Sequence, residues 1–237
     1  MEVLRLKLFQ ETACYKKPFA FKVGETYPLP PYSTVKGMLH AILEAKEFIP
    51  MRISIQGTYD TMMVDYQTFY FFKKSNIKEF PLVLDGLIEK PDIDPKNLST
   101  MPIYSHMLYH VDLIIHVGAE EKILDEIIKR IEEQDQHISL GRWEDLVRID
   151  EYKRVHLEPL KDREEVELKK DAYIPVLIMP SNFNYVPYRL NWKYEIKNNV
   201  RQWEKIEVGY VNGGVSLLGK PYLVDVDEYN PVIFHDM

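Results

Sequence analysis

Hydrophobic and polar residues alternate from Val3 to Phe9, which is the pattern of a β-strand with one buried face. The next pattern is helical: residues 33–48 carry apolar side chains at spacings of three and four, with Ser33 as the expected N-cap. The apolar stripe consists of Val35, Met38, Leu39, Ile42 and Leu43. This register places Lys36 and His40 on the opposite face of the helix, which we expect to be exposed to solvent.

The next elements follow from the same two periodicities. The sequence predicts strands at Ile53–Tyr59, Met62–Phe72, Ile103–Val117 and Leu146–Leu157, and an amphipathic helix at Ala119–Gln134. Residues 75–100 contain three prolines and no clear period, which indicates an inserted arm. The order strand, helix, strand, strand, helix, strand is that of the ferredoxin-like fold, which RNA-recognition modules share. We therefore expect an α+β protein built on a ferredoxin-like domain.

The last part of the chain has strand patterns and no convincing helix. The candidate strands are Tyr173–Met179, Leu190–Ile196, Ile206–Val211 and Tyr222–Val226. We expect a ferredoxin-like domain over residues 1–160 and a small C-terminal β-rich region over residues 161–237. Asn212 and Gly213, which lie between two of the candidate strands, predict a hairpin turn, because both residue types tolerate positive φ.

Composition and charge narrow the class of protein. Cys14 is the only cysteine, which excludes an intrachain disulfide and a cysteine-rich zinc site and favours a reducing, cytoplasmic environment. The N-terminal residues lack the apolar stretch of a signal peptide, and we expect no transmembrane helix. The formal net charge is -7, but the acidic excess is concentrated in residues 119–171, and the first sixty residues are slightly basic. The charge therefore permits a local basic groove without predicting one.

The segment Pro28–Leu39 (PLPPYSTVKGML) is the first candidate for binding chemistry. Ser33 and Thr34 open the predicted helix, and the unpaired N–H groups of a helix N-terminus suit a phosphate. The lysines that would add positive charge there are Lys16, Lys17 and Lys36. The alternative is structural: Gly37 would only allow close packing of the helix on the sheet, and the prolines would only stiffen the loop.

The segment Leu140–Arg148 (LGRWEDLVR) is the second candidate. Arg142 and Arg148 offer planar guanidinium groups for phosphates, and Trp143 offers a face on which a base can stack. The alternative is that Arg142 pairs internally with the two carboxylates that follow Trp143.

Three histidines of the strand at 103–117 share one face if the strand is regular. These are His106, His110 and His116, with Asp112 between the last two. Because a strand rises about 3.3 Å per residue, His106 and His110 lie too far apart to bind one metal ion. A polar sheet face is the simpler interpretation, and we expect neither a metal site nor a cofactor.

The segments TYPLPPYSTVKGMLHAIL (Thr26–Leu43) and LGRWEDLVRID (Leu140–Asp150) together resemble the Cas-five family of CRISPR-associated proteins, in particular its type I-B branch. The resemblance covers residues 1–160 well and the rest loosely. It implies the ferredoxin-like fold of the RAMP superfamily and a subunit of the Cascade interference complex, which serves antiviral defence. Such a subunit binds the 5′ handle of the guide CRISPR RNA. It caps the backbone of Cas-seven subunits, contacts a Cas-eight-type large subunit, and meets target DNA through the assembled complex.

The resemblance turns the two candidate segments into an expected RNA-binding surface. Its residues would be Lys16, Lys17, Tyr32, Ser33, Thr34, Lys36, Gly37, His40, Arg142, Trp143 and Arg148. An alternative function is the metal-independent cleavage of precursor CRISPR RNA, as in the type I-C branch, with Tyr32, Lys36 and His40 as the acid–base set. That branch's residues do not map onto matching positions here, and type I-B systems usually employ a separate Cas-six ribonuclease. The resemblance therefore favours binding without catalysis.

Overall fold

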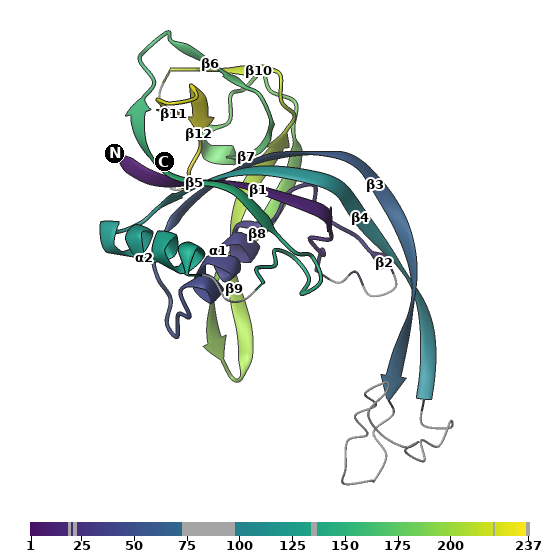
Figure 1. The fold of residues 1–237 in the computed structure, drawn as a ribbon. Coiled ribbons are helices and arrows are strands. Elements are labelled where there is room, and N and C mark those ends of the chain that lie inside the picture. Colours follow the sequence, from purple (N-terminus) through teal and green to yellow (C-terminus); the bar gives the residue numbers. More distant parts are fainter. Residues whose placement is uncertain (19, 21–22, 73–97, 134–136, 220, 236–237) are drawn as a thin grey trace.

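The computed structural model describes residues 1–18, 20, 23–72, 98–133, 137–219 and 221–235 (Figure 1). Two α-helices lie among these residues, α1 (Tyr32–Ile42) and α2 (Glu121–Glu132). The strands are β1 (Glu2–Ala13), β2 (Val23–Gly24), β3 (Arg52–Phe72), β4 (Leu98–Gly118), β5 (Arg148–Pro159), β6 (Glu165–Leu168), β7 (Asp171–Pro175), β8 (Val186–Lys197), β9 (Val200–Val211), β10 (Val215–Leu218), β11 (Leu223–Asp225) and β12 (Asn230–Val232). The α+β class expected from the sequence is confirmed.

One large sheet organises the described residues. Its strand order is β12-β11-β5-β1-β4-β3-β7-β9-β8, with antiparallel neighbours throughout this path, and β2 pairs in parallel with β4. The strands after residue 160 extend both edges: β7, β9 and β8 continue from β3, and β11 and β12 continue from β5. A separate pair, β6 and β10, completes the described strands. The predicted domain boundary at residue 160 stays a prediction.

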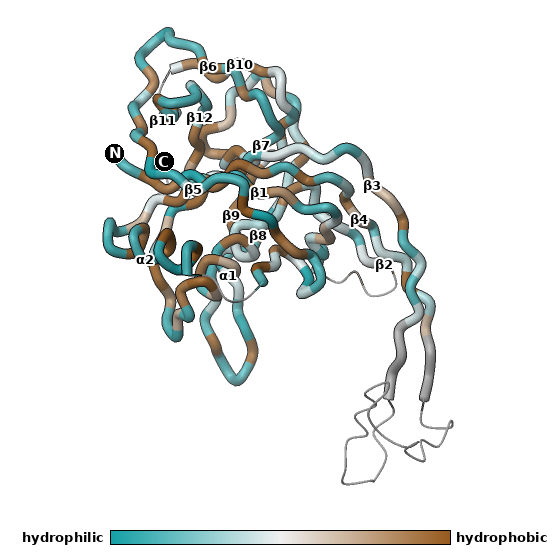
Figure 2. Tube along the Cα trace, viewed as in Figure 1, coloured by the Kyte–Doolittle hydropathy of each residue, from teal (hydrophilic) through white to brown (hydrophobic). Residues whose placement is uncertain are grey.

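The main hydrophobic core lies between the sheet and the two helices. Leu4, Leu6 and Leu8 of β1 face the helices because they alternate along the strand, and each is nearly inaccessible to solvent. Val35 and Leu39 of α1 pack into the same core, as do three buried apolar residues of α2. Figures 1 and 2 show the helices on one side of the central strands and hydrophobic residues concentrated where α1 meets them. Burying each large aliphatic side chain contributes about 1.5–3 kcal/mol.

The opposite face of the central strands carries buried polar groups beside an apolar cluster that includes Val3 and Val232, and it holds the C-terminal strands in place. Arg5 of β1 and His116 of β4 are cross-strand partners on this face, and both contact the buried carboxylate of Asp225 from β11. The Arg5 guanidinium donates to Asp225 at 2.6 Å, and His116 Nε2 lies 3.1 Å from the same oxygen. A buried carboxylate with two such donors fixes the position of β11 on the sheet.

Helix α1 differs from its prediction at both ends and on one face. Its N-cap is Pro31 rather than Ser33, without a side-chain capping hydrogen bond, and the helix ends at Ile42 instead of near Phe48. Glu44, with φ of 50°, lies in the left-handed region just past that end, where the helix cannot continue. Lys36 was expected to be exposed but is buried, because β8 covers the face of α1 opposite the predicted stripe. The apolar periodicity of α1 predicted that one face packs on the central sheet, but it did not predict that β8 covers the opposite face.

The prediction of two strands between residues 53 and 72 was also wrong, since β3 is a single strand. The predicted break falls at Asp60, where β3 passes an irregular position shared with β4: His110 has φ of 50°. Leu108 and Val111 both face the main core although they lie three residues apart, so the alternation of β4 reverses at this point. His106, His110 and His116 therefore do not share one face. His110 Nδ1 lies 2.8 Å from Asp60, and not beside Asp112.

Two further expectations concern connections. The turn at Asn212–Gly214 joins β9 to β10, but these strands pair with other strands, so the predicted hairpin was wrong. The predicted arm at residues 75–100 falls almost entirely outside the described residues. In the part of the chain that the structure describes, no helix is long and apolar enough to cross a membrane.

Candidate functional site

Four of the predicted site residues lie on one face of α1 and line a pocket. They are Ser33, Lys36, Gly37 and His40, at the i, i+3, i+4 and i+7 positions. The facing wall comes from the β8–β9 hairpin and from the segment after α1, and the cavity measures about 440 Å³. We call it the Lys36 pocket. Its other lining residues are Ala45, Lys46, Glu47, Phe48, Trp192, Lys193, Tyr194, Ile196 and Trp203.

The Lys36 ammonium lies between aromatic rings. Only 6% of the residue is exposed, and Nζ lies 3.7 Å from the ring centroid of Trp192 and 4.8 Å from that of Phe48. Among the described residues, Nζ has no hydrogen-bond partner. Burial lowers the pKa of Lys36 to about 8, the charge of Lys193 adds to this effect, and Glu204 opposes it. The group is therefore mainly protonated at neutral pH, as a buried cation stabilised by ring faces.

Both ring nitrogens of His40 are occupied by backbone groups. Nδ1 lies 2.8 Å from the Lys36 carbonyl oxygen, and Nε2 accepts a hydrogen bond of 3.0 Å from the Ile49 N–H. This pattern fits the neutral tautomer with the proton on Nδ1. Burial also lowers the pKa of His40. The imidazole therefore ties the end of α1 to the segment that leads to β3.

Tyr32 and Thr34 do not line the pocket. Tyr32 is completely buried, and its ring packs against Trp192 with centroids 6.0 Å apart. Burial raises the pKa of the Tyr32 hydroxyl far above its usual value. The three residues considered as an acid–base set thus separate: Lys36 and His40 reach the pocket, and Tyr32 belongs to the core behind Trp192.

The second predicted segment forms a turn that we call the Trp143 loop (residues 140–147). The buried carboxylate of Asp145 accepts hydrogen bonds from the backbone N–H groups of Cys14 and Arg142, at 3.0 and 2.9 Å. The Arg142 guanidinium bonds to Asp145 at 2.7 Å and to Glu144 at 2.9 Å. Gly141 has φ of 116°, and a Cβ there would lie 2.7 Å from Asp145. Arg142 thus pairs internally, as the structural alternative anticipated.

The Trp143 loop presents its indole to solvent, since Trp143 is 85% exposed. Arg148 lies over the ring of Phe9, 4.4 Å from its centroid, and pairs with Asp150 at 2.6 Å. Lys16, on the segment that Asp145 holds beside the loop, is exposed. Cys14, which contacts Asp145 of the Trp143 loop, lies two residues before Lys16 in the chain.

Lys17 lies nearer to the sheet extension formed by β8. Its Nζ pairs with Glu25 at 3.3 Å and lies 5.8 Å from the ring centroid of Tyr188. Tyr188 and Trp192 are four residues apart on β8, so this strand supplies aromatic contacts to both Lys17 and Lys36. Sequence reasoning missed Trp192, Lys193 and Trp203. The predicted strand Leu190–Ile196 contains Trp192 and Lys193, but Trp203 lies before the predicted start of the next strand at Ile206, and nothing local indicates that the hairpin covers α1.

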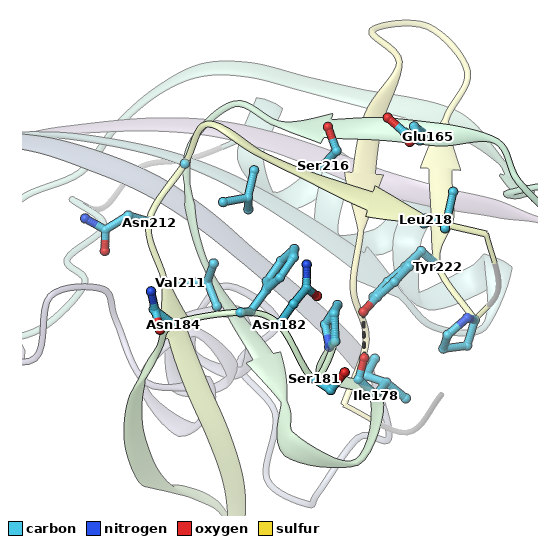
Figure 3. A pocket seen from close by; sticks show the side chains of 15 residues that line it. Glu165, Ile178, Ser181, Asn182, Asn184, Val211, Asn212, Ser216, Leu218 and Tyr222 are labelled. Atoms are coloured by element: carbon cyan, nitrogen blue, oxygen red, sulfur yellow. Dashed lines mark hydrogen bonds between the residues drawn. The ribbon is translucent and has the colours of Figure 1, made fainter.

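A larger cavity of about 950 Å³ lies elsewhere, between the β6–β10 pair and the segment after β7 (Figure 3). Its walls carry the amides of Asn182, Asn184 and Asn212, and the Tyr222 hydroxyl donates to the Ile178 carbonyl at 2.6 Å. Among the residues that the structure describes, its lining includes no Lys, Arg or His and none of the predicted site residues. Nor does any group of three or more His, Cys, Asp or Glu in the described ranges have an arrangement that fits a metal ion.

Residues 3–206 match a family model described as CRISPR-associated protein (Cas_Cas5). A solved chain titled "CRISPR RNA-guided surveillance complex" is similar, with 15% identity, 90% of this chain and 91% of that chain covered, and a TM-score of 0.56. A CRISPR protein from Archaeoglobus fulgidus has 12% identity, 99% of both chains covered and a TM-score of 0.47. No curated protein matches the sequence. Because the family model spans most of the residues, the chain belongs to the Cas-five (Cas5) family of CRISPR-associated proteins.

Proposed function

We propose that the chain is a non-catalytic subunit of a type I CRISPR effector complex. In this role it binds the 5′ handle of the guide RNA and caps the Cas-seven backbone beside a Cas-eight-type large subunit, which brings it to target DNA. The observation that carries the proposal is the family match over residues 3–206. The fold likeness to a chain of an RNA-guided surveillance complex supports it.

The proposal treats residues 1–160 as a ferredoxin-like RAMP domain with an arm at residues 75–100, and residues 161–237 as a C-terminal β-rich region. The antiparallel order β5-β1-β4-β3, with α1 and α2 on one face, supports this division. The strands of the C-terminal region then extend both edges of that four-stranded unit.

The Trp143 loop is the proposed contact for an unstacked base of the handle. An exposed indole stacks on any base, and each such contact contributes about 1–3 kcal/mol. The loop's hydrogen bonds to Asp145 hold Trp143 outward before RNA arrives, which lowers the entropic cost of binding. Lys16 and Arg148 lie on neighbouring segments and supply positive charge. Because the Arg148–Asp150 ion pair is exposed, Arg148 gives up Asp150 for a phosphate at little cost in free energy.

The geometry of His40 supports binding without cleavage. Cleavage by acid–base chemistry needs a base that reaches the 2′-hydroxyl and an acid that protonates the leaving oxygen. Both nitrogens of His40 hold backbone groups, and Tyr32 is buried away from the pocket. Catalysis by these residues would require the end of α1 to open first.

The test is incubation of the purified protein with its full-length repeat RNA in EDTA, measured both as a gel shift and as cleavage. We expect a shift without a discrete cut, and about tenfold weaker binding for Trp143→Ala. Leu177→Ala is the matched control, because Leu177 is 94% exposed and lies outside the proposed surface. A metal-independent cut that His40→Ala abolishes would overturn the non-catalytic assignment. No RNA binding, even with the backbone subunits added, would overturn the proposal.

A further inference from the structure

The Lys36 pocket contains a buried positive charge without a matching carboxylate. Burying an ammonium costs several kcal/mol unless it is paired or hydrogen-bonded, and ring faces offset only part of that cost. Glu204 is the carboxylate that favours the charged form of Lys36, but its own ion pair, at 3.0 Å, is with Lys193. The described residues thus leave Lys36 Nζ without an acceptor, at the wall of a cavity.

The charges around the cavity favour an anion. Lys36, Lys46 and Lys193 line it, and Glu47 is the one acidic residue among the described residues that line it. The first turn of α1 carries no acidic side chain, so the positive end of its helix dipole is not neutralised there. Ser33, in that turn, adds a hydroxyl to the pocket wall.

Gly37 opens the wall of the pocket. It is exposed, and a Cβ at this position would meet no atom within 4 Å. The lack of a side chain at Gly37 is therefore not needed for close packing of α1 against the described residues. Close packing on the sheet was the structural alternative for this glycine. The lack of a side chain instead leaves the backbone of α1 accessible from the cavity, next to Lys36.

The opposite wall is aromatic. Tyr194 and Trp203 are cross-strand partners on β8 and β9, with ring centroids 4.9 Å apart. Trp192, on the same hairpin, contacts the Lys36 ammonium. Such rings suit a planar heterocycle, and a volume of about 440 Å³ lies within the range of small-ligand sites.

We propose that the Lys36 pocket binds one nucleoside monophosphate group, with the phosphate at Lys36 and the Ser33–Gly37 face, and the base against Tyr194 and Trp203. Lys36 reaches the phosphate by rotation of its flexible stem, which exchanges ring contacts for an ion pair. The group is either a free mononucleotide or an unpaired nucleotide of an RNA chain. The proposal does not depend on handle binding, because a free mononucleotide tests the pocket alone.

The first test measures binding of adenosine 5′-monophosphate, adenosine and inorganic phosphate to the full chain by titration calorimetry. We expect one saturable site for the monophosphate and at least tenfold weaker binding of the other two. Lys36→Met should weaken monophosphate binding at least tenfold and leave adenosine binding unchanged, and Lys36→Arg should restore most of the affinity. Trp203→Ala should weaken the binding of both the monophosphate and adenosine. Lys161→Met, on an exposed residue outside the pocket, is the matched control.

A second variant keeps the proposal testable if Lys36→Met fails to fold. Gly37→Leu places a side chain in open space beside the pocket, so it should block the monophosphate without unfolding α1. Competition between the monophosphate and the repeat RNA would identify an RNA nucleotide as the occupant, and its absence would identify a free mononucleotide. No saturable monophosphate binding to the wild type would overturn the pocket proposal. Loss of RNA binding alone would contradict only the proposed function.

Discussion

Single residues of α1 and β3 show how much the absence of a side chain matters. Gly37 faces open space, whereas a Cβ on Gly57 would lie 2.6 Å from the Leu113 side chain and 2.7 Å from the Asp112 carbonyl. The first glycine costs helix stability without a packing benefit. The second allows the close approach of β3 and β4.

We therefore expect Gly37→Ala to raise the free energy of unfolding by about 0.5–1 kcal/mol, because alanine favours the helix. Gly57→Ala should lower it by about 1–3 kcal/mol, because the added carbon overpacks the sheet. Urea unfolding followed by circular dichroism measures both. A destabilised Gly37→Ala variant would mean that the α1 backbone packs more closely than the contacts indicate.

Trp143 and Trp192 differ strongly in how far they are exposed to solvent. Trp143 is 85% exposed and Trp192 is 7% exposed. Trp143→Ala should change the free energy of unfolding by less than about 0.5 kcal/mol, and Trp192→Ala should lower it by about 3–5 kcal/mol. Thermal unfolding of the two variants provides the comparison. Equal destabilisation would show that Trp143 is covered in solution, which would remove it from the proposed RNA surface.

At the scale of elements, the attachment of β11 to the sheet depends on charge. Burial alone would raise the pKa of Asp225, but the hydrogen bonds from His116 and Arg5 outweigh it and bring the pKa to about 2. Burial lowers the pKa of His116 despite its bond to Asp225. Both groups bind fewer protons in the folded state than in the unfolded state, so acid weakens the attachment.

We therefore expect a two-stage loss of stability in acid. The contribution of His116 is complete above its unfolded pKa near 6.5 and is lost as the pH falls below that value. The contribution of Asp225 to the free energy of unfolding is about 2 kcal/mol, and it is lost as the pH falls from 3.8 to about 2. Urea unfolding at a series of pH values measures both. Asp225→Asn should remove the second stage and destabilise the fold by about 3 kcal/mol at pH 7. Asp227→Asn, in the exposed pair with Lys153, is the control and should cost less than about 1 kcal/mol.

Local sequence patterns predicted a helix or strand well where the element packs against a single neighbour. The alternation from Val3 to Phe9 predicts β1, and the apolar stripe of α1 predicts its contact with the sheet. The same pattern misplaced Lys36, because β8 approaches α1 from more than 140 residues away in sequence. The irregular position at Asp60 and His110 was interpreted as the end of a strand. Its cause is a backbone conformation that sequence periodicity does not reveal.

At the scale of the whole molecule, the net charge of -7 limits how the proposed RNA is held. Aromatic stacking and a few local cations must supply most of the affinity. We expect the logarithm of the binding constant for the repeat RNA to fall with the logarithm of salt concentration with a slope of about -1 to -3, the value for two to four phosphate contacts. Filter binding at several salt concentrations measures the slope. A slope of about -6 would correspond to roughly seven to nine phosphate contacts and would contradict this expectation.

Only one half of the candidate site was predicted, because its two halves come from distant parts of the sequence. The α1 half lies in one continuous segment, so Ser33, Lys36, Gly37 and His40 were identified together. The β8–β9 half, with Trp192 and Trp203, comes from a region expected to form a small separate part. Only the three-dimensional order of strands, in which β7 pairs with β3, brings that hairpin to the helix.

The placement of late strands at both edges of the sheet has a consequence for biosynthesis. β3 gains its neighbour β7 only after more than a hundred further residues have been made, since Gln56 pairs with Ala172. β5 gains its neighbour β11 after about 65 further residues, since Pro159 pairs with Leu223. At a synthesis rate of about 5–20 residues per second, the edge of β3 waits on the order of ten seconds on the ribosome. During that interval the nascent chain presents unpaired strand edges, which other chains can join. Yield in cells is therefore expected to depend on translation speed and on chaperones that shield these edges.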